Sequence, residues 1–237
     1  MRVAAVQFKA TKADPERSLA RLVPLVERAA PGSDLVVLPE MATTGYVFAS
    51  ADEIAPLAEP PDGRTFAALS PLARAHGAFV VAGFVERGAE GRLYNSALVI
   101  DRDGALVFVY RKTLLYDLDH AWATPGDSGY RTFDTGRGRF GVGICMDLND
   151  DRFTAWVAGC GARAIAFPTN WLDQDHEVWS YWAWRLDGAR VALVAANTWG
   201  EEGEVRFRGE SAILDHRTLR AAAPLTGDGV LVATLPR

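Results

Sequence analysis

The chain has 237 residues, of which 49% are hydrophobic and 23% charged, and its formal net charge is -5. These values are typical of a globular protein, and the negative charge excludes the basic surface by which proteins bind nucleic acid. No apolar run approaches the roughly 18 residues of a membrane-spanning helix, and the first residues lack the pattern of a signal peptide. We therefore expect one domain over residues 1–237, located in the cytoplasm, with neither nucleic acid nor a membrane as a partner.

Segments typical of strands and helices alternate through the first half of the chain. Asp14 and Pro15 match the cap and first residue of a helix, and Gly77 is typical of a helix end. The pair Asp103-Gly104 predicts a hairpin. The expected strands are 3–8, 35–38, 79–85, 94–100 and 106–110, and the expected helices begin after Asp14 and span 65–76.

The second half repeats this coarse plan without visible sequence identity to the first. The expected strands are 130–133, 140–144, 164–167 and 191–196, one helix follows Cys145, another lies around 177–188, and 211–214 and 229–235 form a last hairpin. Two such halves predict an α/β fold, a four-layer αββα sandwich of two mixed sheets with helices on their outer faces.

Three reactive side chains directly follow expected strands: Glu40, Lys112 and Cys145. In open α/β sheets, ligands and catalytic groups gather at the carboxyl ends of the strands. A thiol with a pKa near about 8.5 is mostly protonated at neutral pH, so a nucleophilic cysteine needs a base or a nearby cation. Glu40 can supply the base, and a buried Lys112 can stabilise both a thiolate and the oxyanion formed when a carbonyl or nitrile carbon is attacked.

Other interpretations of these residues stay open at this point. Cys145 can be a packing residue, as we expect of Cys160 on the apolar face of the following helix. Histidine is the usual partner of a catalytic cysteine, and only His120 lies near a loop that we expect to form a pocket. The other histidines are His76, His176 and His216. A Cys-His hydrolase is therefore an alternative that the sequence does not support.

Short motifs around the three side chains resemble those of the nitrilase superfamily of carbon-nitrogen hydrolases. The signature of that superfamily is a Glu-Lys-Cys triad in this order, and the resemblance extends over nearly the whole chain. The motifs are Leu38-Pro-Glu40, Tyr110-Arg-Lys-Thr-Leu114 and Gly143-Ile-Cys-Met-Asp147, with further landmarks at 3–7, 45–46, 125–127, 168–171, 196–197 and 209–211. The resemblance implies the αββα fold and an amidase that acts on a small-molecule amide.

The resemblance also implies roles for these residues. Glu40 acts as the general base and later as the acid, Cys145 is the nucleophile, and Lys112 with the backbone N–H of Met146 stabilises the oxyanion. Ammonia or an amine leaves, and water then hydrolyses a thioester, so that no metal or organic cofactor is needed. By the same resemblance we expect a homodimer or a higher homo-oligomer.

Two departures from the superfamily pattern bear on the substrate. Where members often carry a second glutamate before Pro-Gly-Asp, this chain offers Asp119, which we assign as a positioning acid. Where many have Cys-Tyr-Asp, this chain has Cys-Met-Asp-Leu-Asn, which resembles fungal amidases that deamidate N-terminal Asn or Gln. A substrate with a free α-ammonium is therefore a narrower hypothesis. The expected substrate-binding residues are Tyr46, Asp147, Asn149, Asn170 and Trp171.

Alternatives to an amidase remain. A nitrilase or an N-carbamoyl hydrolase of the same family uses the same nucleophile on a different carbon-nitrogen bond. A nitrilase-like scaffold that binds a partner without turnover is favoured by the short loop and the missing second glutamate, and the complete triad argues against it.

Overall fold

Two six-stranded sheets packed face to face form the centre of the molecule in the computed structural model, which describes residues 1–236. The first sheet has the order β14-β1-β2-β3-β4-β5, with bounds Gly229–Thr234, Arg2–Gln7, Leu35–Val37, Phe79–Arg87, Leu93–Ile100 and Leu106–Arg111. The second has the order β13-β12-β9-β8-β7-β6, with bounds Thr218–Ala222, Ala212–Asp215, Ala192–Asn197, Ala164–Thr169, Arg139–Val142 and Thr132–Asp134. Both sheets mix parallel and antiparallel pairs, as the sequence predicts.

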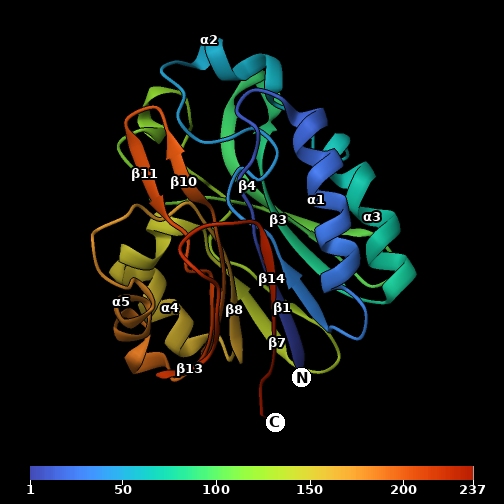
Figure 1. Ribbon diagram of the computed structural model, residues 1–237, viewed down its shortest axis with the longest axis vertical. Helices are drawn as coiled ribbons and strands as arrows, with labels where there is room; N and C mark the ends of the chain where they lie inside the picture. The colour runs from blue at the N-terminus through green and yellow to red at the C-terminus, as the bar shows by residue number, and fades with distance from the viewer. Residues whose placement is uncertain (237) are drawn as a thin grey trace.

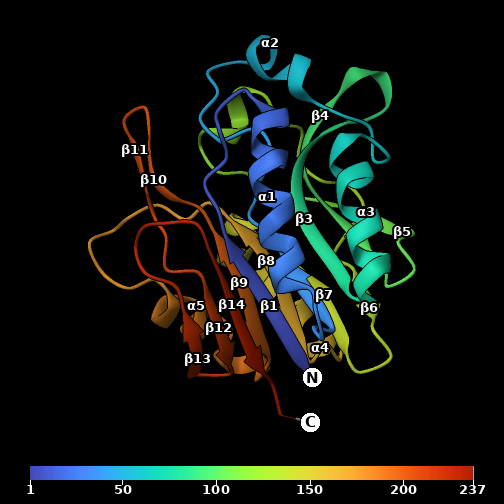
Figure 2. The same ribbon diagram turned by 45° about the vertical axis from the view of Figure 1, so that its right-hand side comes forward.

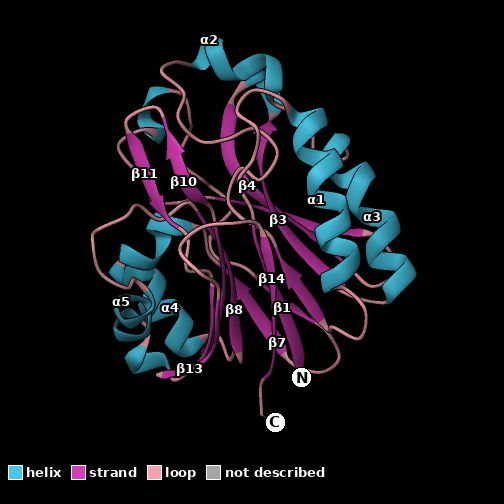
Figure 3. Ribbon diagram, in the orientation of Figure 1, coloured by secondary structure: helices cyan, strands magenta, loops and turns pink. Residues whose placement is uncertain are grey.

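Helices cover the outer face of each sheet (Figures 1 and 3). On one side lie α1 (Pro15–Ala29) and α3 (Arg64–His76), and on the other lie α4 (Asp151–Gly159) and α5 (Trp179–Arg185), as the turned view also shows (Figure 2). The short α2 (Ala51–Ile54) and the 3-10 turns Ala55–Leu57, Ala89–Gly91, Asp119–Ala121, Cys145–Asn149 and Asp187–Ala189 complete the helical elements of residues 1–236. None of these helices is both long and apolar enough to cross a membrane.

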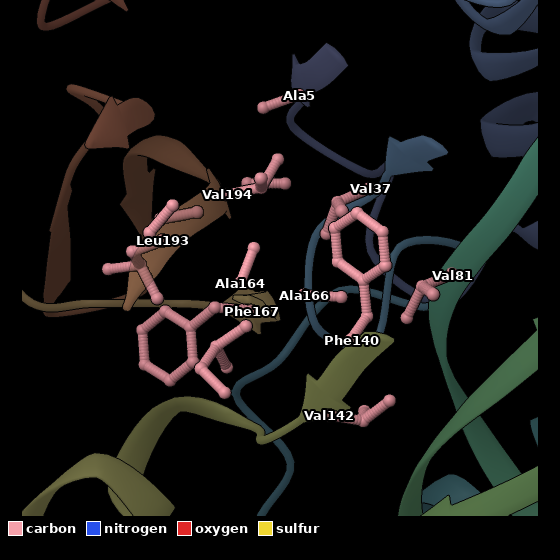
Figure 4. Close-up of a cluster of buried hydrophobic side chains, with 14 of the residues drawn as sticks. Ala5, Val37, Val81, Phe140, Val142, Ala164, Ala166, Phe167, Leu193 and Val194 are labelled. Atoms are coloured by element: carbon pink, nitrogen blue, oxygen red, sulfur yellow. The ribbon is translucent and has the colours of Figure 1, made fainter. Parts of the chain in front are cut away.

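The strands of the first sheet are apolar on both faces because both faces are covered. Val3, Ala5 and Val37 belong to the core between the sheets, which Figure 4 shows in close-up. The alternate residues Ala4 and Val6 pack with the inner faces of α1 and α3. The period of two along each strand therefore assigns one set of side chains to the sheet–sheet core and the other to the sheet–helix core.

The helix ends in the first half follow the expected capping chemistry. The Asp14 side chain accepts the backbone N–H of Arg17 and Pro15 starts α1, while Gly77 ends α3 with φ of 64°. Such left-handed backbone costs a glycine little because it has no Cβ. Cys160, expected to be a buried residue, is only half-buried at the end of α4.

The last hairpin is placed differently from the sequence prediction. Strand β12 pairs with β13 through a turn at His216 and Arg217, whereas β14 crosses to the first sheet and pairs antiparallel with β1. His216 adopts φ of 55° without the Asn-Gly or Asp-Gly pair that usually marks such a turn, so the turn carries no sequence signal. A further hairpin of β10 (Trp199–Glu202) and β11 (Val205–Arg208) was not expected.

Candidate active site

A buried cluster of charges lies where strands of the first sheet end. Glu40 follows β2, and Lys112 is the first residue after β5. Lys112 Nζ donates to Glu40 Oε1 at 2.7 Å and to Asp119 Oδ2 at 2.6 Å, and all three side chains are almost completely buried. Two carboxylates therefore share one ammonium group out of contact with bulk water. Glu40, Lys112 and Asp119 are thus brought together from segments up to 79 positions apart, between residues 40 and 119.

Uncharged donors complete the coordination of Glu40. Asn95 Nδ2 on β4 donates to Glu40 Oε1 at 2.7 Å and to Asp119 Oδ1 at 3.3 Å. The backbone N–H of Asn170, after β8, donates to Glu40 Oε2 at 2.8 Å. Burial raises the pKa of Glu40 above its ordinary value of 4.5, although Lys112 opposes this shift. Burial alone would lower the pKa of Lys112, but the neighbouring negative charges, Glu40 foremost and Asp119 among the others, together outweigh burial and raise the pKa, so the lysine is cationic at neutral pH.

The backbone at Glu40 depends on a glycine in the neighbouring strand. A Cβ built on Gly83 of β3 would lie 2.5 Å from the Cα of Glu40 and from the carbonyl oxygen of Pro39. The residue after Glu40, Met41, adopts φ of 46°, and Ala42 donates its N–H to the carbonyl of Gly83 at 3.0 Å. Gly83 therefore lets the Glu40 segment approach closely and bend across the middle of β3.

Cys145 lies at the sharp turn after β7, as the sequence predicts. It is the first residue of the 3-10 turn Cys145–Asn149, and its φ of 43° is rare for a residue with a side chain. Burial raises the pKa of its thiol to about 12; the Glu40 carboxylate adds to this shift and Lys112 opposes it. The thiol is therefore protonated at neutral pH and lies within reach of the charges on Glu40 and Lys112.

A cavity of about 70 Å³ opens beside Cys145. Five of the residues proposed from the sequence as substrate-binding or oxyanion-stabilising line it, namely Tyr46, Met146, Asn149, Asn170 and Trp171. The sequence did not predict the other lining residues, which are Tyr116, Leu172 and Gln174. None of the four histidines lines this cavity.

Asp147 does not line the cavity, although we expected it to bind substrate. Its carboxylate is buried and accepts four hydrogen bonds, from the hydroxyl of Tyr110 at 2.7 Å and from the backbone N–H groups of Thr113, Leu114 and Ile144 at 2.9 Å. These bonds fasten the Cys145 turn to the segment after Lys112. Asp147 therefore positions the Cys145 turn, and its contact with substrate stays a prediction.

Two buried polar atoms on the cavity wall have no partner within the described chain. They are the hydroxyl of Tyr46 and Oδ1 of Asn170. The Tyr46 segment is held by Glu202 of β10, whose carboxylate accepts the backbone N–H groups of Tyr46 and Val47 at 2.8 and 2.9 Å. A buried polar atom without a partner costs free energy, so each one needs an explanation. Binding of a ligand is one such explanation.

Asn95 and Gly83 are the positioning residues that sequence reasoning missed. Both carry a weak signal, since Gly83 interrupts the apolar run Phe79–Val85 and Asn95 is an amide in a strand that is buried throughout. Neither has a partner that can be identified from the sequence. No group of three metal-binding side chains occurs among residues 1–236.

The chain resembles known proteins over nearly its whole length. The family model described as carbon-nitrogen hydrolase matches residues 2–237. A nitrilase from Pyrococcus abyssi is 34% identical over 215 residues, which cover 90% of this chain and 80% of that protein. A 2-oxoglutaramate amidase from Bacillus subtilis is 29% identical over 221 residues, covering 90% of this chain and 82% of that protein.

Solved structures share the fold. A variant of the Nesterenkonia AN1 amidase from the nitrilase superfamily superposes with a TM-score of 0.87 at 24% identity, covering all of this chain and 90% of that chain. The predicted arrangement of two mixed sheets between helices is confirmed by this likeness and by the strand order.

Proposed function

We propose that this chain, which belongs to the carbon-nitrogen hydrolase family of the nitrilase superfamily, is an amidase with a Glu40-Lys112-Cys145 triad. It is a hydrolase of carbon-nitrogen bonds, and the proposed substrate is a small non-peptide or terminal amide. The observation that carries the proposal is the buried Glu40–Lys112 pair at 2.7 Å beside a thiol that opens onto a cavity.

Glu40 is the proposed general base for the first step. Because the thiol of Cys145 is protonated at neutral pH, its proton must leave as sulfur attacks the amide carbon. A carboxylate with a raised pKa is a better proton acceptor than an ordinary glutamate. The proton moves to Glu40, the sulfur–carbon bond forms, and the carbonyl oxygen becomes an oxyanion.

Lys112 and the backbone N–H of Met146 are the proposed oxyanion stabilisers. Lys112 is cationic and held by two carboxylates, so it does not need to reorganise when charge develops. Met146 lies on the cavity wall directly after the nucleophile. Collapse of the tetrahedral intermediate breaks the carbon–nitrogen bond, and Glu40 returns its proton to the leaving ammonia or amine.

Water completes the proposed cycle. Glu40, again a carboxylate, removes a proton from water as its oxygen attacks the thioester carbon. The thioester then breaks, Cys145 regains its proton, and a carboxylic acid leaves. Asp119 contacts Lys112 and we assign it a positioning role, in place of the superfamily's second glutamate.

An ammonia-release screen over amides, nitriles and carbamoyl compounds tests this proposal. We expect release from small amides by the wild type and none above background from the Cys145→Ala variant. Turnover that survives in that variant would exclude Cys145 as the nucleophile. A nitrilase would instead convert nitriles faster than amides, and an inert scaffold would form no acyl adduct on Cys145 detectable by mass spectrometry.

The cytoplasmic location and the homodimer remain predictions. Light scattering of the purified protein checks the second, since a monomeric mass at micromolar concentration would contradict it.

A further inference from the structure

We infer that the acyl part of the substrate is short and uncharged, and that amides bearing a carboxylate or an ammonium group are rejected. This inference rests on the proposed function, because it names the substrate class of the same site. It depends on the size of the cavity at Cys145, on the chemistry of its walls, and on the charges beneath it.

The cavity encloses only a few atoms. Its volume is about 70 Å³, roughly half of the ~150 Å³ apolar cavity that accommodates benzene. An acyl chain of about three non-hydrogen atoms therefore fills it. Longer chains extend past Gln174, which is exposed at the mouth, and gain little contact there.

No acidic, basic or imidazole side chain lines the cavity within residues 1–236. Its walls are thiol, thioether, aromatic, aliphatic and amide groups. A charge buried there without a partner loses its hydration and recovers little in return. An uncharged acyl group has no such cost, and Trp171 and Leu172 offer it apolar surface.

Two charged residues that lie outside the buried cluster, Asp173 and Arg185, are engaged in other interactions. Asp173, two positions after Trp171, forms ion pairs with Arg206 at 2.8 Å and Arg208 at 3.0 Å. Arg185 donates to the carbonyl of Leu148 at 2.8 Å and pairs with Asp151. None of these groups is available to bind a charged substrate without breaking an existing pair.

The buried cluster beneath the cavity adds a bias against anions. Two carboxylates, Glu40 and Asp119, share the single ammonium of Lys112, so a substrate carboxylate meets no excess of positive charge. The α-ammonium hypothesis also loses its support. Asp147 is fully occupied by four donors, and Asn149 Oδ1 already accepts the hydroxyl of Tyr181 at 2.7 Å.

Two isosteric pairs of amides test the inference at pH 7. Isovaleramide and malonamate differ only in a neutral or anionic end, and butyramide and β-alaninamide only in a neutral or cationic end. Leaving an unpaired charge in a buried site costs enough to lower kcat/KM at least about a hundredfold for the charged member. A charged member that equals or exceeds its neutral partner would overturn the inference.

Alkylation of Cys145 gives a readout that does not need turnover. The rates of reaction with iodoacetamide and iodoacetate, followed by intact mass and each divided by the rate for glutathione, measure the preference of the cavity. We expect a ratio of at least about one hundred in favour of iodoacetamide. If none of the four amides is hydrolysed, the proposed function fails, and this ratio still decides the inference: a value near one contradicts it.

A matched pair of variants at the exposed Gln174 tests whether the discrimination against anions comes from the lack of charge at the cavity. Gln174→Lys places a cation at the mouth, and Gln174→Met removes the amide without adding charge. We expect the lysine variant to raise the relative rate of iodoacetate about tenfold over the methionine variant, because one nearby opposite charge offsets part of the penalty. Equal ratios in the two variants would contradict a cavity whose selectivity comes from missing charge.

Discussion

The two ends of the site at Cys145 are built in opposite ways. At the chemical end, each carboxylate of the buried cluster has at least two partners, and Lys112 joins Glu40 to Asp119. At the acyl end, two buried polar atoms of the cavity wall, on Tyr46 and Asn170, have no partner in the described chain. The charged groups of the first end therefore hold one another in place, although Asn95 Oδ1 beside them also lacks a partner among residues 1–236, whereas the second end has unpaired groups on a cavity wall.

This difference implies different responses to substitution. A group removed from the chemical end leaves a buried charge unpaired, so both activity and folding suffer. A group removed from the acyl end leaves nothing unpaired in the free protein, so only substrate binding changes. The substitutions below test that contrast.

Lys112→Met should have the largest effect. It leaves two buried carboxylates without a cation, which typically costs about 3–5 kcal/mol of stability, and it removes the proposed oxyanion stabiliser. We expect kcat to fall at least about a thousandfold and the denaturant midpoint to drop. Lys12→Met is the control, since Lys12 pairs with Glu53 at 3.5 Å and both side chains are 40% exposed. That exposed pair is worth at most about 1 kcal/mol, and equal losses in the two variants would refute the special role of burial.

Glu40→Gln should lower activity much more than stability. The amide keeps the shape, but it removes the base and the negative charge opposite Lys112, so we expect kcat to fall about 10²–10⁴-fold. Stability should fall less than in Lys112→Met, because Asp119 still pairs with Lys112. The Glu40 carboxylate raises the pKa of Cys145, so that pKa should fall below about 12 in the variant. Ultraviolet titration of the thiolate measures this, and an unchanged or higher thiol pKa would show that the two groups do not interact.

The difference in unfolding free energy between the wild type and Glu40→Gln should depend on pH. Burial raises the pKa of Glu40, so its ionised form costs folding free energy above the folded-state pKa. The wild type should therefore gain stability relative to Glu40→Gln as pH falls from above the folded-state value toward 4.5. Urea unfolding of both proteins across this range checks the slope, and a relative loss on acidification would contradict it.

Gly83→Ala tests whether the backbone at Glu40 is as constrained as its side chain. The added Cβ would meet backbone atoms 2.5 Å away, so the Glu40 segment must shift. We expect a loss of kcat of about 10²-fold, because a displacement of about 1 Å has this effect on a catalytic group. Gly159→Ala is the matched control, since a Cβ there meets nothing within 4 Å. Normal kcat in Gly83→Ala would mean that the segment adapts freely.

Tyr46→Phe should have the smallest effect. Its hydroxyl has no partner among residues 1–236, so we expect stability within about 1 kcal/mol of wild type and a fall in kcat/KM of up to about tenfold. Tyr110→Phe is the comparison, because that buried hydroxyl donates to Asp147 at 2.7 Å. Its removal should cost about 1–3 kcal/mol of stability. If the two variants lose equal stability, the contrast between the ends of the site fails.

Local patterns in the sequence predicted much of the fold. The capping residues Asp14 and Gly77 and the period of two in buried strands are local signals, and they predicted elements that the structure contains. Glu40, Lys112 and Cys145 could be found because each follows an apolar strand, and their roles stay a prediction until they are tested.

Contacts between distant segments could not be predicted in this way. Asn95 bonds to Glu40 and Asp119, 55 and 24 positions away, and nothing near Asn95 indicates these partners. Asp147 looked like a substrate ligand because it is an acid beside the cysteine, whereas its four donors come largely from the Lys112 segment. Side-chain direction at a tight turn depends on the packed structure, which a linear pattern does not contain.

The pairing of β14 with β1 also has a consequence for biosynthesis. Register partners such as Arg2 and Thr234 lie far apart in the sequence, so the first sheet keeps an open edge at β1 until β14 leaves the ribosome. An open apolar edge strand favours association with other chains. Nascent chains stalled before residue 229 should therefore bind chaperones and aggregate more than chains that include β14, although they already contain every residue of the proposed triad.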